Sequence, residues 1–65
     1  MVKGKQLQSF KDVKVDQWIY VNWWDDPYKL LPVRKKYKGY IIVETPNGGL
    51  LEVDNPKACW EAIEQ

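Results

Sequence analysis

The chain has 65 residues, with ten lysines and arginines, nine aspartates and glutamates, one cysteine and no histidine. This length allows one domain, and a single cysteine without histidine excludes an internal disulfide and a cysteine–histidine zinc site. The net charge of +1 is far below that of proteins that coat DNA, and no apolar run is long enough to cross a membrane. We therefore expect a soluble, cytoplasmic protein that holds no cofactor and no metal.

The first nine residues are polar and lack periodicity, which predicts a flexible N-terminal arm over residues 1–9. Residues 10–65 are then expected to form a single small domain, because the chain contains neither an internal repeat nor a low-complexity tract. Leu7 and Phe10 are the apolar side chains that could hold the end of the arm against this domain.

From about residue 17 to residue 24, nearly every side chain is β-branched or aromatic, which is typical of a strand. Successive side chains of a strand point to opposite faces. The predicted core face carries Ile19, Val21 and Trp23. The opposite face carries an aromatic stripe, which consists of Trp18, Tyr20 and Trp24. This stripe is exposed unless the N-terminal arm or the C-terminal segment covers it.

An acidic loop over residues 25–29 separates this strand from a second one, which is predicted over residues 30–38. Its inward side chains are expected to be Leu31, Val33 and Tyr37. Pro32 has no N–H to donate, so the beginning of this strand is expected at an edge or a bulge.

Two turn signals define the next hairpins. Lys38-Gly39 marks a tight turn before an apolar strand over residues 40–45. Asn47-Gly48 lies between two apolar runs and indicates a hairpin, because both residue types tolerate a positive φ. The last predicted strand follows over residues 50–53.

The C-terminal segment changes its period. Asn55 is a good helix cap and Pro56 suits the first helical position. Cys59, Trp60 and Ile63 then follow at helical spacing, which predicts a short α-helix over about residues 56–64. A helix this short is unstable alone, so its Trp60 face is expected to pack on the sheet, with Cys59 as a buried structural thiol.

The predicted fold is therefore mainly β, a small five-stranded, partly open barrel with a short C-terminal helix. The order of residue types from Val13 to Val53 resembles the SH3-like small β-barrel of the Tudor or integrase C-terminal type. The matching positions are Val15, residues 18–24, Asp25-Asp26, Pro32-Val33, Lys38-Gly39, residues 40–43, Asn47-Gly48 and residues 50–53. The Tudor resemblance implies an aromatic cage for a methylated lysine or arginine, with rings from Trp23 or Trp24, Tyr28 and Tyr40.

Binding rather than catalysis is the expected function, because the sequence contains no pairing of a nucleophile with a base and no phosphate-binding loop. The first hypothesis is a small regulatory or accessory protein, of the kind that phages encode, which binds a protein partner or a second copy of itself. Aromatic side chains are frequent at the energetic centres of such interfaces. The expected contact residues are Trp18, Tyr20, Trp24, Asp25, Asp26 and Tyr28.

The alternative hypothesis is binding of nucleic acid by the basic strand, with lysines on the phosphates and a tyrosine ring on a base. The expected contact residues are Arg34, Lys35, Lys36, Tyr37, Lys38 and Tyr40, and alternation would place Arg34, Lys36 and Lys38 on one face. Glu44 and Glu52 lie on neighbouring predicted strands, where they could neutralise this charge. The lysines could equally serve only to keep an edge strand from pairing with other chains.

Overall fold

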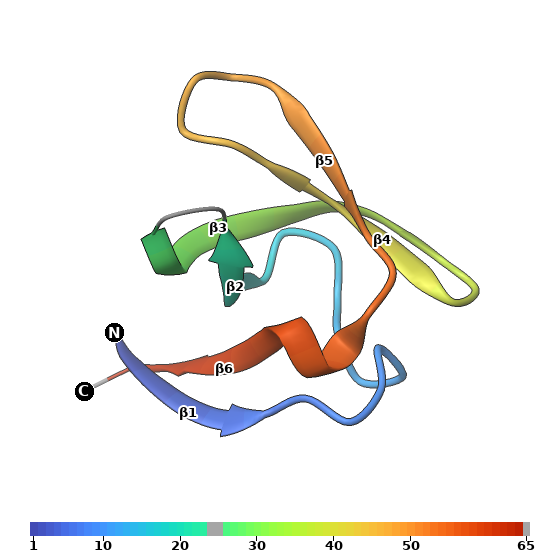
Figure 1. Cartoon of the computed structure of the whole chain (residues 1–65). Coiled ribbons are helices and arrows are strands. Elements are labelled where there is room, and N and C mark those ends of the chain that lie inside the picture. Colours follow the sequence, from blue (N-terminus) through green and yellow to red (C-terminus); the bar gives the residue numbers. More distant parts are fainter. Residues whose placement is uncertain (24–25, 65) are drawn as a thin grey trace.

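Six antiparallel strands form one open sheet in the computed structural model, which describes residues 1–23 and 26–64 (Figure 1). The elements are β1 (Val2–Gln6), β2 (Trp18–Trp23), β3 (Asp26–Tyr37), β4 (Tyr40–Glu44), β5 (Leu50–Val53), the 3-10 turn η1 (Pro56–Ala58) and β6 (Cys59–Ile63). The strand order is β1-β6-β2-β3-β4-β5, so β1 and β5 are the two edges and the barrel is not closed. The mainly β fold class is thus confirmed, whereas the predicted number of five strands is wrong, because residues 2–6 and 59–63 also form strands.

The N-terminal segment is part of this sheet. Residues 2–6 form β1, which pairs with β6 through Val2 and Ile63, Lys3 and Ala62, and Gln6 and Trp60. Pairing satisfies backbone N–H and C=O groups that would otherwise stay open along β6, which explains why a polar segment without periodicity becomes a strand. The flexible arm predicted for residues 1–9 is therefore not what the structure has at residues 2–6.

The predicted C-terminal helix is wrong. The local signals act as expected, because Asn55 Oδ1 accepts a hydrogen bond from the Lys57 amide at 3.1 Å and Pro56 begins the turn. The turn ends after three residues, and Cys59–Ile63 continues as β6, which pairs with β1 on one side and β2 on the other. Strand pairing on both sides outweighs the modest helical preference of so short a segment.

A β-bulge at Arg34 changes the phase of β3. Val33 pairs with Val43 while Lys35 pairs with Ile42, which leaves Arg34 as the extra residue. Beyond the bulge Lys36 pairs with the buried Ile41, and Tyr37 pairs with Tyr40 on the outer face. Tyr37 is 44% exposed, so its predicted inward position is wrong, and the bulge is the reason.

The core lies on the inner face of the curved sheet. Its buried side chains are Phe10, Val13, Ile19, Val21, Leu31, Val33, Ile41, Val43, Val53 and Cys59, with Leu7 and Leu51 packed against them. The inward predictions for Ile19, Val21, Leu31 and Val33 are confirmed. Both predicted turns are present, with Gly39 at a φ of 90° and Gly48 at a φ of 84°, where glycine is favoured.

Candidate binding surfaces

Among the side chains that the structure describes, four aromatic rings lie on the outer face of β2, β3 and β6. The registers place Tyr20 opposite Trp60 of β6 and Leu30 of β3, and Trp18 opposite Pro32. Trp18 is 44% exposed and Tyr28 is 45% exposed, while Tyr20 and Trp60 are half-buried. We call the four rings, Trp18, Tyr20, Tyr28 and Trp60, the aromatic face.

One end of the aromatic face is tied together by ring contacts. Tyr28 packs edge-to-face on Trp60, with ring centroids 5.0 Å apart and planes at 89°. The Lys3 ammonium from β1 lies over both rings, 4.2 Å from the Tyr28 centroid and 5.1 Å from that of Trp60. Tyr20 Oη donates a hydrogen bond to the Met1 carbonyl at 2.8 Å. These contacts link β1, β6, β2 and β3 across the outer face.

The other end of the aromatic face borders a hollow of about 300 Å³. We call it the Trp18 hollow, because the Trp18 ring forms part of its wall. Leu30, Pro32 and Pro46 supply apolar surface, and Arg34 and Glu44 supply charge. An apolar side chain of a partner could enter here and still place a polar neighbour beside the charged pair.

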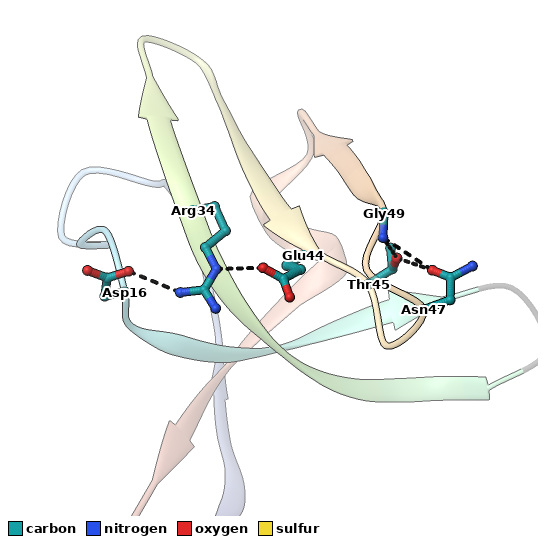
Figure 2. A network of polar contacts seen from close by, with 6 residues as sticks. All are labelled: Asp16, Arg34, Glu44, Thr45, Asn47 and Gly49. Carbon is teal, nitrogen blue, oxygen red and sulfur yellow. Dashed lines mark hydrogen bonds and ion pairs between the residues drawn. The ribbon is translucent and has the colours of Figure 1, made fainter.

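Arg34 lies between two carboxylates rather than free for a ligand (Figure 2). Its Nε donates to Glu44 Oε1 at 2.9 Å, and its Nη1 donates to Asp16 Oδ1 at 3.2 Å. The hydrogen bond to Glu44 raises the pKa of Arg34. Beside this pair, the turn before β5 is closed by Thr45 Oγ1, which donates to Asn47 Oδ1 and accepts from the Gly49 amide at 2.9 Å.

A second hollow, of about 380 Å³, lies between the loop after β1 and the β3–β4 turn. We call it the basic hollow; residues 8–11, residues 36–39 and Pro56 line it. It brings together three lysines, Lys11, Lys36 and Lys38, and none of the described residues that line it is acidic. Lys36 Nζ donates to the Lys11 carbonyl at 2.8 Å, which holds the loop against β3.

Tyr37 forms one side of the basic hollow. Its ring stacks on Tyr40, with centroids 4.9 Å apart and planes at 19°. Lys35 lies on the same outer face, opposite Ile42, and Ile42 in turn lies opposite Glu52. Of the two glutamates expected to neutralise the basic strand, Glu44 pairs with Arg34, whereas Glu52 is separated from Lys35 by β4.

The structure therefore rearranges both predicted sites. Of the protein-binding set, it brings Trp18, Tyr20 and Tyr28 to one face; Trp24 and Asp25 lie outside the described residues, and of Asp26 only the backbone is described, at the start of β3. The basic set divides into an ion-paired Arg34, an outward Lys35 and a group formed by Lys36, Tyr37 and Lys38 at the basic hollow. The predicted sharing of one face by Arg34, Lys36 and Lys38 is broken by the bulge.

The sequence does not predict the positions of three residues of these surfaces. Trp60 was expected to face the sheet from a helix, and only the shortness of that helix hinted at another structure. Lys3 and Lys11 lie in segments without periodicity, so no pattern indicated that they meet Tyr28 and Lys36. Of the rings expected to share a cage, Tyr28 contacts Trp60 and Tyr40 stacks on Tyr37 at the other end of β3, while the side chains of Trp23 and Trp24 lie outside the described residues.

The buried Cys59 thiol belongs to the core. Burial raises the pKa of Cys59 from its ordinary 9.0 to about 11, so the thiol stays protonated at neutral pH. In residues 1–23 and 26–64, no three histidine, cysteine, aspartate or glutamate side chains gather in a group that could hold a metal ion. The described part of the chain also contains no helix with the length and apolarity needed to cross a membrane.

Comparison of the chain with known protein families, with curated proteins and with solved structures finds no match.

Proposed function

We propose that this protein is a non-enzymatic binding module that holds a segment of a protein partner on its aromatic face, in a regulatory or accessory role. The observation that carries this proposal is the exposed Trp18 ring at the rim of the Trp18 hollow. A ring of this size, nearly half exposed beside Leu30 and Pro32, offers the large apolar contact that dominates protein interfaces.

The arrangement of the aromatic face supports a preformed binding surface. Its rings project from the paired strands β2, β3 and β6, the Tyr28–Trp60 contact restrains two of them, and the hydrogen bond to Met1 restrains Tyr20. A partner that extends from Trp18 over these three rings would meet side chains that lose little further freedom on binding. We also propose a relationship to the SH3-like small β-barrels. The order of strands and turns along the chain supports it.

Selection from a displayed random-peptide library, followed by titration of the enriched peptides, tests this proposal. We expect Trp18→Ala to weaken peptide binding at least about ten-fold, as is typical of an interface centre. Tyr37→Ala is the matched control, because Tyr37 is also 44% exposed but lies at the basic hollow. Equal losses in the two variants, or enrichment of no peptide, would contradict the proposal; peptide-free dimerisation lost on Trp18→Ala would make a second copy the partner.

One contact favours a second candidate function, the recognition of a methylated lysine. The corner between Tyr28 and Trp60 already holds an ammonium group, that of Lys3. A methylated ammonium from a partner could take this place, since cation–π attraction does not require N–H donors. Titration with a trimethyllysine peptide and its unmethylated form tests this; we expect tighter binding of the methylated form, and a further gain on Lys3→Ala.

A further inference from the structure

The positive charge of the chain is unevenly balanced. Arg34 is paired with Asp16 and Glu44, whereas within the described residues no carboxylate pairs with Lys11, Lys36 or Lys38. Asp12, the nearest acid along the chain from Lys11, lines a different hollow. The basic hollow therefore concentrates three uncompensated charges in a protein whose net charge is only +1.

The surface between these lysines is apolar and aromatic. Phe10, Tyr37 and Pro56 contribute to the lining, and Tyr37 keeps 44% of its surface exposed although Tyr40 covers one face of its ring. Tyr40 also holds the ring in place. The volume of about 380 Å³ lies within the range of small-ligand sites. Cations around a flat apolar surface suit a ligand that has both a phosphate and an aromatic ring.

We propose that the basic hollow binds single-stranded nucleic acid, with phosphates held by Lys11, Lys36 and Lys38 and a base stacked on Tyr37. A base can stack on an exposed ring only when it is unpaired, which favours a single strand over a duplex. Lys11 comes from one of the two segments that border the hollow and Lys36 and Lys38 from the other, so both sides present cations to a bound strand. This site is separate from the aromatic face and does not depend on its proposed role.

Titration of the whole chain with a labelled oligothymidylate of about 12 nucleotides tests this inference. Three neutralised phosphates on a single strand give a salt slope of about −2, so raising the salt from about 50 to about 200 mM should weaken binding about 20-fold. We expect a duplex of the same length and thymidine monophosphate to bind much more weakly.

Two sets of variants locate the site. Changing Lys11, Lys36 and Lys38 together to Gln should abolish most of the affinity and the salt dependence. The control changes Lys5, Lys14 and Lys35 to Gln, which alters the net charge equally at exposed positions outside the basic hollow. Tyr37→Leu should weaken binding about ten-fold relative to the wild type, because it removes the ring. Tyr37→Phe and Trp18→Ala should both bind as tightly as the wild type.

Five results would overturn the inference: no binding at the lower salt, equal losses in the two triple variants, undiminished binding by Tyr37→Leu, equal binding of the duplex, or equal binding of the mononucleotide. The last result would assign the hollow to a free nucleotide instead. Because Tyr37→Phe and Tyr37→Leu keep the charge and an apolar side chain, they test the stacked base even where the triple lysine variant fails to fold.

Discussion

The aromatic face and the basic hollow are built in opposite ways. The aromatic face gathers rings from residues 18 to 60, over three strands whose pairing connects distant parts of the chain. The basic hollow is mostly made by two short segments, residues 8–11 and residues 36–39. Within residues 1–23 and 26–64 its lysines pair with no carboxylate, whereas Lys3 at the aromatic face lies over the Tyr28 and Trp60 rings. A chain whose net charge is close to zero thus has two surfaces of different chemistry.

This difference has a physical origin in the bulge of β3. Before Arg34, even-numbered residues such as Tyr28 and Leu30 lie on the outer face together with β2 side chains. After Arg34 the phase shifts, so Tyr37 is outward and Lys36 is free to reach the Lys11 carbonyl. One extra residue therefore separates the aromatic part of β3 from the basic part.

Deleting Arg34 should have the largest effect, because it removes the phase shift on which both surfaces depend. Without it, either Lys36 must leave the loop at Lys11 or Val33 must leave the core. We expect loss of most of the folding free energy, which for a chain of this length is about 3 to 10 kcal/mol in total. Chemical denaturation followed by far-UV circular dichroism, and the dispersion of the amide NMR spectrum, measure the loss.

Arg34→Ala is the control for this deletion, because it keeps the chain length and removes only the exposed ion pairs. The variant should retain the native NMR spectrum, with a small change in the denaturation midpoint. A deletion variant that keeps the native spectrum would show that the β3–β4 turn can absorb the missing residue, and that the bulge does not divide the two surfaces.

Trp60→Ala should have an intermediate effect on stability. Its comparison with Tyr37→Ala shows which of the two surfaces contributes more to the stability of the fold. Trp60 is half-buried, contacts Tyr28 and belongs to the strand that joins β1 to β2, so its loss should cost about 2 to 3 kcal/mol. Tyr37→Ala removes a more exposed ring and should cost about 1 kcal/mol. Urea denaturation of both variants gives the two values; equal costs would refute the view that the aromatic face is the more deeply integrated region.

The sequence predicts those parts of this fold in which local pattern and tertiary packing agree. The inward positions of Ile19 and Val33 and the turns at Gly39 and Gly48 follow from alternation and from turn chemistry. The helix was mispredicted because the cap at Asn55 and the proline after it suit a 3-10 turn as well as an α-helix. The choice between the two depends on the pairing of residues 59–63 with β1 and β2, and this pairing is a tertiary interaction.

The candidate surfaces were less predictable than the core for a related reason. The sequence identified Trp18 and Lys36 as residue types suited to binding, but not their neighbours. Which cations remain unpaired depends on the bulge and on Asp16, which has a φ of 73° in the turn before β2 and meets Arg34 there. No periodicity encodes contacts of this kind, because they join loops to strands.

The smallest expected effect is a loss of stability at high pH that originates beneath the aromatic face. Cys59 lies in β6 next to Trp60, opposite Val21, and burial raises the pKa of its thiol to about 11. A group whose pKa is raised on folding stabilises the folded state below its unfolded pKa, and this contribution is lost as the pH rises towards the folded pKa.

For Cys59 that window runs from 9.0 to about 11, since the unfolded chain loses the proton first. At pH 10 the thiol should therefore cost about 1 kcal/mol of stability relative to pH 8. Because tyrosines and lysines titrate in the same range, the measured quantity is the difference between the wild type and Cys59→Ala in denaturation free energy at each pH. A difference that stays constant from pH 8 to pH 10 would mean that solvent reaches the Cys59 thiol in β6. The core side of the aromatic face would then be as accessible to solvent as the basic hollow.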